Sequence, residues 1–346
     1  MAHFDPSAAA QPDSGIFGLA SSAAESEVHV LPVPFDATAS YRKGARKGPD
    51  AILRASRQVD LFDSATGRPY EAGIHMLAPA AEIAELAERA HEHAERVIAA
   101  GGDLSRDTRL AVDLENVNAI GARINELVAA ASREILAQNK LVAVVGGDHS
   151  TPFGAIQACA ERFPGLGVLH FDAHADLRVA YEGFEWSHAS IMDNVTRRLP
   201  DIGLLAQVGI RDFCEEEHER IANSRGRIVT MFDRDWSNAR LSGANLRYKI
   251  RSHLARLPHF VYVSFDIDGL DPQLCPNTGT PVPGGLTWAE AMLWLDELSM
   301  CGKRVVGLDV NEVNPGAAAD DEDSWDAMVG ARLLYRLIGT ALVTRR

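Results

Sequence analysis

Short apolar runs alternate with amphipathic segments along most of this 346-residue chain, and this alternation constrains the fold more than any other feature. Short runs bounded by turn residues predict buried strands, whereas apolar residues recurring every 3.6 positions predict helices. A strand–helix–strand order requires crossover connections, which give a parallel sheet covered by helices on both faces. The sequence therefore predicts an α/β protein with a central, mostly parallel sheet flanked by helices.

The expected strands and helices can be placed from residue 28 onward. We expect strands at residues 28–33, 141–145, 167–171, 204–210, 227–231, 260–265 and 304–309. We expect helices at residues 51–57, 81–100, 116–139, 287–300 and from 326 to about 342, with further helices between the later strands. No linker rich in Pro and Gly divides this series, so residues 28–346 are expected to form one domain.

The first 27 residues differ from the rest in composition. They are rich in Ala, Ser and Asp, contain scattered Pro and Gly, and show no apolar periodicity. Segments of this kind rarely bury enough apolar surface to become ordered by themselves. We therefore expect residues 1–27 to form a flexible or loosely packed extension, or a contact between subunits.

Net charge and cysteine usage exclude several classes of function. A formal charge of −14 argues against a nucleic-acid or membrane-surface partner, because both need basic patches. An acidic surface suits a cationic ligand, although it more often serves solubility alone. The four cysteines are far apart and form no Cys-x-x-Cys pair, which is typical of reduced thiols in the cytoplasm. No apolar stretch approaches the roughly 20 residues of a membrane span.

Three of the expected strands end in clusters of residues that commonly bind metal ions. The clusters supply His149; Asp172, His174 and Asp176; and Asp266 and Asp268. Because the carboxyl ends of parallel strands meet at one edge of the sheet, we expect these side chains to converge on one pocket. One such cluster is a weak signal, since acidic residues often cap loops. Three clusters, each after a predicted strand, indicate a metal site.

The types of ligand indicate which metals the site would bind. Four carboxylates and two imidazoles without a thiolate favour Mn²⁺, Ni²⁺, Fe²⁺ or Co²⁺ over a structural Zn²⁺. Four negative charges balance two divalent ions, and six side chains are too many for one ion that keeps an open position. Two ions about 3.5–4 Å apart can activate a water molecule between them. The clusters therefore predict a binuclear metal centre suited to hydrolysis.

Further motifs accompany the three clusters. They are Arg42-Lys-Gly-Ala-Arg-Lys-Gly-Pro-Asp-Ala-Ile, Thr278-Gly-Thr280-Pro-Val-Pro-Gly-Gly-Leu and Asp309-Val-Asn-Glu312-Val-Asn-Pro. Together with Gly-Gly-Asp-His149-Ser, Asp172-Ala-His174-Ala-Asp176 and Ser-Phe-Asp266-Ile-Asp268-Gly, they resemble the motifs of ureohydrolases, the arginase–agmatinase superfamily. The likeness extends from about residue 28 to residue 342. It implies a three-layer, arginase-like α/β fold in which residues 28–346 are the catalytic domain.

The resemblance also implies how the metal ligands are shared. It implies one ion held by His149, Asp172, Asp176 and Asp266, and a second held by His174, Asp172, Asp266 and Asp268. In this arrangement Asp172 and Asp266 bridge the two ions. Manganese is the usual metal of the family, and nickel is the alternative. The family also implies a homotrimer or homohexamer, and a hetero-oligomer with a related chain stays open.

The resemblance also implies catalytic roles for Glu312 and His188. Asp176 is expected to be both a metal ligand and a catalytic residue. Glu312 matches the carboxylate that pairs with the guanidinium group of the substrate, which suits a planar cation. His188 lies twelve residues after Asp176, close to the position of the family's proton-shuttling histidine. A buried structural histidine is the alternative for His188.

The implied reaction is hydrolysis of a C–N bond in a guanidine-type substrate. A hydroxide bridging the metal ions would attack the guanidinium carbon and release urea or a urea derivative with an amine or ammonia. The segment before His188 would select the substrate, and its aromatic and acidic residues suit a small cation. These residues are Tyr181, Glu182, Phe184, Glu185 and Trp186. Arg178 could receive a substrate carboxylate, but a salt bridge that orders the loop is its simpler interpretation.

We therefore expect guanidine, a substituted guanidine or a biguanide as the substrate. The segment from Tyr181 to Met192, together with Gly209-Ile-Arg-Asp-Phe-Cys-Glu-Glu-Glu, resembles an agmatinase-like subgroup that includes guanidine and biguanide hydrolases. The alternative is agmatine, cleaved to putrescine and urea. Guanidino acids and arginine rank below these, because the segment lacks the small polar residues that resemble those of arginases.

Two other classes of protein were weighed against this hypothesis. A deacetylase of the histone-deacetylase type shares the arginase-like fold but binds one zinc ion, which would leave His149, Asp176 and Asp268 without a role. A single zinc ion per chain would favour that class. The chain could also be an inactive partner in a hetero-oligomer. Such partners usually lose ligands, and all six are present here.

Overall fold

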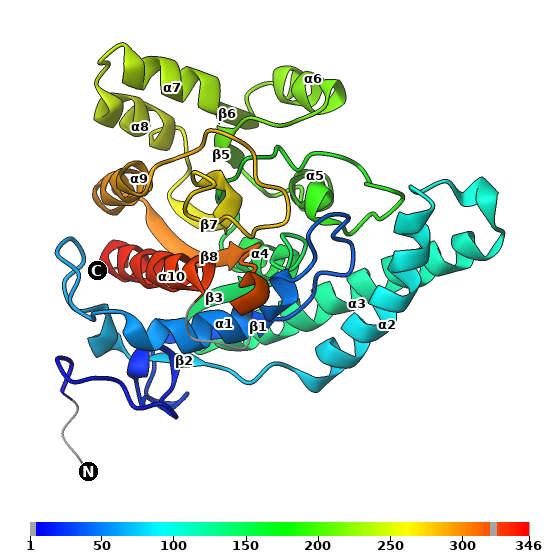
Figure 1. The fold of residues 1–346 in the computed structure, drawn as a ribbon. Helices are drawn as coiled ribbons and strands as arrows, with labels where there is room; N and C mark the ends of the chain where they lie inside the picture. The colour runs from blue at the N-terminus through cyan, green and yellow to red at the C-terminus, as the bar shows by residue number, and fades with distance from the viewer. Residues whose placement is uncertain (1–4, 319–323, 346) are drawn as a thin grey trace.

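The computed structural model describes residues 5–318 and 324–345, which are organised around an eight-stranded sheet (Figure 1). The strand order is β2-β1-β3-β8-β7-β4-β5-β6, and all neighbouring strands are parallel. The strands are β1 (Val28–Val33), β2 (Ile74–Met76), β3 (Leu141–Gly146), β4 (Gly167–Phe171), β5 (Leu204–Ile210), β6 (Ile228–Phe232), β7 (Phe260–Asp266) and β8 (Arg304–Asn311). The predicted parallel α/β architecture is confirmed.

Helices cover both faces of the sheet and complete the three layers. One face carries α1 (Gly48–Ala55), α7 (Asp233–Leu241), α8 (Leu246–Leu254), α9 (Trp288–Met300) and α10 (Trp325–Thr344). The other carries α2 (Ala81–Ala99), α3 (Arg109–Ala137), α4 (Phe153–Arg162), α5 (Ile191–Arg198) and α6 (Glu215–Asn223). Strand residues alternate between the two cores, as Val30 and Leu31 of β1 do, because successive side chains of a strand point to opposite faces.

Short 3₁₀ turns connect these elements. They lie at Ile16–Gly18, Ala45–Lys47, Ser56–Gln58, Pro69–Ala72, Leu104–Arg106, His188–Ser190, Ile267–Gly269 and Gly316–Ala318. The seven predicted strands are present, and β1, β4 and β5 have the predicted bounds. The edge strand β2 was not predicted, because its three residues are too few to show a pattern. Helix α3 begins at Arg109, seven residues before its predicted start at Asn116.

The prediction of a loosely packed N-terminal extension is wrong for part of that segment. Ile16, Phe17 and Leu19 are buried in the core. The Phe17 amide donates a hydrogen bond to Ser56 Oγ at 2.8 Å, and its ring lies 4.8 Å from that of Tyr335 on α10. A single turn buries three apolar residues here without any periodicity in the sequence. Residues 1–4 lie outside the described part of the chain.

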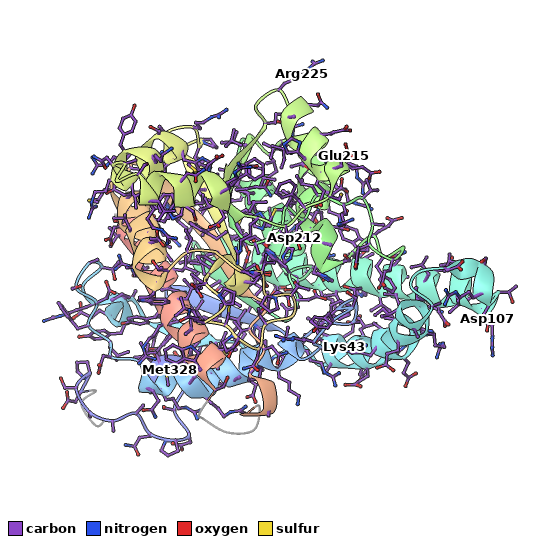
Figure 2. All side chains as sticks on the ribbon, turned by 45° about the horizontal axis from the view of Figure 1, so that its top comes forward. Lys43, Asp107, Asp212, Glu215, Arg225 and Met328 are labelled. Carbon is purple, nitrogen blue, oxygen red and sulfur yellow. The ribbon has the colours of Figure 1, made fainter. Side chains whose placement is uncertain are left out.

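Helices α2 and α3 form a long antiparallel hairpin that projects beyond the rest of the molecule (Figure 1). Asp107 marks the tip of the hairpin in Figure 2. Near the tip, Asp113 on α3 accepts hydrogen bonds from Arg96 on α2 at 2.6 and 2.7 Å, which ties the two helices together. The base of the hairpin packs on the sheet, and its outer half contacts the segment that precedes His188.

The expectation that no stretch approaches a membrane span is wrong for α10, which is long and apolar enough to cross a membrane by length and composition alone. However, 78% of its most apolar window is buried inside the fold. The helix packs between α1, α9 and β8, so its apolar surface is used within the protein. These contacts identify α10 as a core helix of the fold.

His253 on α8 is expected to make the fold less stable as the pH falls from 6.5 to about 4. The ring is buried against Trp294, and burial, followed by the charge of Arg256, lowers the pKa of His253 from 6.5 to about 4. Between pH 6.5 and about 4, the His253 imidazole binds a proton in the unfolded chain but stays neutral in the folded protein. Stability is therefore fully present above pH 6.5 and falls by roughly 3 kcal/mol toward pH 4, at about 1.4 kcal/mol per pH unit.

Urea unfolding at several pH values would measure this dependence on His253. The variant His253→Phe should lose this part of the pH slope, whatever its absolute stability. Replacement of the exposed His259 by Phe is the matched control and should keep the slope. Parallel stability curves for the wild type and His253→Phe would contradict the prediction.

Candidate metal centre

The central strands of the sheet carry the predicted site at their carboxyl ends. In the order β3-β8-β7-β4, β3 leads to His149, β8 to Glu312, β7 to Asp266 and β4 to Asp172. Strands β3 and β4 follow each other in sequence but are separated by β8 and β7 in the sheet. Crevices at such reversals of strand order are where α/β sheets bind ligands. The topology thus gathers residues that are far apart in the sequence.

The first group of predicted ligands surrounds His149. Its Nδ1 lies 2.9 Å from Asp172 Oδ2, 3.2 Å from Asp176 Oδ2 and 3.4 Å from Asp266 Oδ2. All four side chains are buried. Potential ligand atoms of His149, Asp172 and Asp176, together with one of His170, lie within 4.8 Å of one another, a spacing that one small cation could span.

The second group surrounds His174 and shares Asp172 with the first. His174 Nδ1 lies 3.5 Å from Asp172 Oδ1 and 3.1 Å from Asp268 Oδ2. The potential ligand atoms of these three residues lie within 4.8 Å of one another. The structure therefore brings all six predicted ligands together in two adjoining groups. Their role as ligands stays a prediction.

Hydrogen bonds fix which nitrogen of His149 faces the carboxylates as a ligand. Ser264 Oγ donates to Asp309 Oδ1 at 3.0 Å, since a carboxylate can only accept. The same hydroxyl oxygen lies 2.9 Å from His149 Nε2 and so accepts a hydrogen bond from the Nε2–H group. This leaves Nδ1, on the side of Asp172, as the atom available to a metal ion. Hydrogen-bond partners of this kind orient metal-binding histidines.

The electrostatics of the cluster suit divalent cations. Burial and the charge of Asp172 raise the pKa of Asp176 to about 8. Burial and the neighbouring Asp268 raise the pKa of Asp266 well above its usual range. Burial alone would lower the pKa of His149, but the surrounding carboxylates raise it well above its ordinary value. A divalent cation would reduce the electrostatic repulsion between these carboxylates. The donor set therefore fits a metal centre.

The backbone of Asp176 adopts a left-handed conformation with φ of 54°. Residues other than glycine rarely adopt it, and each instance costs on the order of 1–3 kcal/mol. The Asp176 carbonyl accepts hydrogen bonds from Met192 N and Asp193 N, both at 3.0 Å, so the start of α5 holds this conformation. Such strain at a non-glycine residue is common where a side chain must be aimed into a functional site.

Glu312 lies directly behind His149. Its Oε1 accepts a hydrogen bond from His149 N at 2.9 Å, and its backbone, with φ of 62°, is fixed by a bond from its own amide to Gly147 O at 2.9 Å. Burial and the charge of Asp148 raise the pKa of Glu312 well above its usual range. A β-carbon added at Gly279 would lie 3.4 Å from Glu312 Oε2, so Gly279 packs close to this oxygen.

A cavity of about 160 Å³ opens beside the carboxylates. It is lined by Ser40, His174, Asp176, Arg178, Tyr181, His188, Ala189, Asp212, Phe213, Glu217 and Thr280. Within the described part of the chain, this lining includes the predicted catalytic residues Asp176 and His188 but not Glu312. Burial, followed by the neighbouring His174, lowers the pKa of His188 to about 4. Among the described residues, its Nδ1 has no hydrogen-bond partner.

The expected aromatic and acidic wall of the cavity is wrong except at Tyr181. Phe184 is fully buried against α2 and α3, and Trp186 lies under the Arg198 guanidinium, 4.4 Å from its ring centre. Glu185 pairs with Arg198 at 2.7 Å. These side chains turn away because the α2–α3 hairpin offers them an apolar surface. Nothing in the local sequence indicated that the hairpin reaches this segment.

Arg178 follows the simpler of its two interpretations. Its Nε lies 3.7 Å from Glu217 Oε2, and its guanidinium lies 5.5 Å from the centre of the Tyr181 ring. The Glu217 carboxylate is itself fixed, because it accepts hydrogen bonds from Leu177 N at 2.9 Å and Cys214 N at 2.8 Å. Arg178 is therefore held at the wall of the cavity and brings a positive charge to it.

Two polar residues near the site were missed in the sequence. Asp212, labelled in Figure 2, lines the cavity with a side chain that is 67% exposed, and its Oδ2 lies 3.9 Å from His174 Nε2. It follows β5, so an acidic residue shortly after one more predicted strand was the available signal. His170 Nε2 lies 2.8 Å from Asp172 Oδ2. Since residues i and i+2 of a strand share a face, its position two residues before Asp172 was the signal there.

Comparison with known proteins agrees with this architecture. The Arginase family matches residues 26–339 of the chain. The chain is 34% identical to the N(1)-aminopropylagmatine ureohydrolase of Thermus thermophilus, over 91% of this chain and 90% of that protein. It is 30% identical to the agmatinase of Photorhabdus laumondii, over 91% and 87%. The arginase of Bacillus caldovelox has the same fold, with a TM-score of 0.62 at 23% identity over 90% and 98% of the two chains. The chain therefore belongs to the arginase family and is a ureohydrolase, an enzyme that hydrolyses C–N bonds of linear amidines.

Proposed function

We propose that this ureohydrolase uses two divalent metal ions to hydrolyse guanidine or a small substituted guanidine or biguanide. The observation that carries the proposal is the cavity of about 160 Å³ next to the carboxylate cluster, whose wall presents the cation of Arg178. A small substrate needs little room beyond its guanidinium group. A longer substrate with a second positive charge would meet Arg178, and like charges repel.

The metal ligands are assigned from the convergence of donor atoms. One ion would be held by His149, Asp172, Asp176 and Asp266, and the other by His174, Asp172, Asp266 and Asp268. When bound, the ions would supply a water molecule activated near neutral pH. The oxygen-rich donor set supports manganese, with nickel as the alternative. We also propose a homo-oligomer in the cytoplasm, which the four free cysteines suit.

Glu312 is the residue we assign to the guanidinium group of the substrate. Its Oε1 is engaged by His149 N, and its Oε2 lies close to Gly279, the neighbour in sequence of the cavity-lining Thr280. A carboxylate suits a planar cation because it can accept hydrogen bonds from two N–H groups. Glu312 would thereby orient the guanidinium carbon toward the metal cluster.

His188 is assigned to proton transfer. Burial and the neighbouring His174 lower its pKa, so the imidazole is neutral near pH 7, and once protonated it would give up that proton readily. Its Nδ1 carries no other hydrogen bond among the described residues and lies at a cavity-lining position. A proton collected there could be passed to the departing amine, which must be protonated to leave.

Agmatine is the second candidate, and one observation favours it. Asp212 lies at the cavity wall with a largely exposed carboxylate, which could pair with the distal ammonium group of agmatine. The relatives named above as an agmatinase and an aminopropylagmatine ureohydrolase also support this candidate. Arg178 opposes it, because its cation would have to share the same small cavity with that ammonium group.

A substrate panel on protein loaded separately with Mn²⁺ and with Ni²⁺ tests the proposal. We expect urea or ammonia to be released from guanidine with a higher kcat/KM than from agmatine or arginine. The variant Arg178→Ala should raise kcat/KM for agmatine about tenfold, because it removes a repelling charge. Arg198→Ala is the matched control, since Arg198 packs on Trp186 outside the cavity.

Two outcomes would contradict the proposal. Faster release from agmatine or arginine than from guanidine, with both metals, would overturn the choice of substrate. An equal change in the Arg178→Ala and Arg198→Ala variants would show that Arg178 does not select against a second positive charge.

A further inference from the structure

His170 is a buried histidine that lies against the proposed metal centre without being one of its six assigned ligands. It is fully buried on β4, and its Nε2 lies 2.8 Å from Asp172 Oδ2. Its ring centre is 5.2 Å from that of His149. His170 could therefore be a seventh ligand or a hydrogen-bond donor to Asp172. The position of its proton distinguishes these two roles.

Gln207 on β5, paired with His170 in the sheet register, determines that position. Its Nε2 lies 2.8 Å from Ala175 O and 3.2 Å from His170 Nδ1. A backbone carbonyl can only accept, so the amide nitrogen, not the amide oxygen, must face Ala175. The same NH₂ group then directs its second hydrogen at His170 Nδ1, which must present a lone pair. The proton of the neutral imidazole is therefore on Nε2 and points at Asp172.

Thr230 on β6 completes the chain of hydrogen bonds. Its hydroxyl donates to Gln207 Oε1 at 3.0 Å, and the register pairs the two residues on neighbouring strands. This contact is compatible with the amide orientation that Ala175 O requires, because a hydroxyl can donate to the amide oxygen of Gln207. The bonds run in one direction, from Thr230 through Gln207 and His170 to Asp172, across three adjacent strands. His170 and Gln207 are both fully buried, so their mutual bonds replace those that water would otherwise supply.

We propose that His170, Gln207 and Thr230 are positioning residues that hold the carboxylate of Asp172 for metal binding, and that His170 is not itself a ligand. The inference rests on the proposed role of Asp172 as a shared ligand. The other oxygen of Asp172, Oδ1, accepts from His174 N at 2.6 Å, so the protein holds both oxygens of this carboxylate. Removing a partner of a metal-binding group typically lowers metal affinity about 10–100-fold.

Titration of the metal-free, full-length protein with Mn²⁺, in competition with a fluorescent chelator, tests this inference without measuring turnover. We expect His170→Phe to lower the affinity about 10–100-fold and to keep the number of ions bound per chain. Gln207→Met should lower it in the same direction but less, and Thr230→Val least. His29→Phe is the matched control and should bind like the wild type, because His29 is a buried histidine on β1 bonded to Ala23 O instead.

Each outcome of this experiment has a distinct meaning. Wild-type protein that binds no Mn²⁺ would refute the proposed function itself. Tight binding by the wild type with unchanged affinity in His170→Phe would overturn the positioning role. Loss of one ion per chain at unchanged affinity for the rest would make His170 a ligand.

If His170→Phe folds poorly, a second measurement still tests the inference. Nitrogen NMR of ¹⁵N-histidine in the metal-free wild type should show the His170 ring protonated at Nε2 and unprotonated at Nδ1. In Gln207→Met, which retains His170, this single tautomer should be lost. A wild-type ring protonated at Nδ1 alone would overturn the inference.

Discussion

Replacing Asp266 with asparagine is expected to abolish turnover and to remove at least one metal ion from each chain. The Asp266 carboxylate ends β7 among the buried ligand candidates, 3.4 Å from His149 Nδ1, and is assigned to both ions. An amide has no negative charge and cannot bridge two cations as a carboxylate does. We expect kcat/KM to fall at least about 10³-fold, which corresponds to about 4 kcal/mol in the barrier.

Metal content per chain, measured by mass spectrometry on the purified variant, checks the Asp266 prediction alongside kinetics. Asp113→Asn is the matched control: Asp113 is also a buried aspartate, but it pairs with Arg96 in the α2–α3 hairpin. That variant should keep its metal and its turnover. If Asp266→Asn retains two ions and a tenth or more of wild-type turnover, the assigned bridging role is wrong.

The second large effect is expected for Glu312→Gln, which should keep its metal ions and still lose activity. Glutamine retains an oxygen that can accept the His149 N–H bond but lacks the charge that pairs with a guanidinium group. Loss of one preorganised electrostatic contact in a buried site typically costs about 10²–10³-fold in rate. We expect a decrease of this size in kcat/KM for guanidine.

Metal analysis and steady-state kinetics on the same preparation distinguish this effect from loss of the metal centre. Glu290→Gln is the control, because Glu290 is a buried glutamate that caps α9 through Thr287 and lies outside the cavity lining in the described chain. It should leave kcat/KM unchanged. If the Glu312→Gln variant keeps more than a third of the wild-type kcat/KM, the proposed role of Glu312 is wrong. Another carboxylate, such as Asp212, would then bind the guanidinium group.

The parallel sheet and the convergence of the six ligand candidates could be predicted because both follow from local patterns. Buried strands appear as short apolar runs, and residues such as His149 and Asp266 follow those runs directly. Parallel strands then bring their carboxyl ends together whatever the details of packing. The order of the strands was not needed for this prediction, although it determines that β8 lies between β3 and β7.

The residues that were missed or misjudged depend on contacts between distant segments. Phe184 and Trp186 face the α2–α3 hairpin and the Arg198 side chain, neither of which their own sequence reveals. Gln207 acquires its role from the register of β5 against β4 and β6, which a single sequence does not contain. The burial of Phe17 likewise depends on α10, more than 300 residues away in the chain. Local patterns thus located the site, while tertiary packing decided its walls.

The position of β8 bears on when the enzyme can acquire its cofactors during synthesis. Strand β8 is the last strand made, yet it is inserted between β3 and β7 and hydrogen-bonds to both. Until residues 304–311 have left the ribosome, the two halves of the sheet that carry His149 and Asp266 have no common neighbour to join them. Under the proposed assignment, the ion that needs His149 can therefore be captured only after β8 has been made, whereas the ligands of the other ion, His174, Asp172, Asp266 and Asp268, all follow the neighbouring strands β4 and β7.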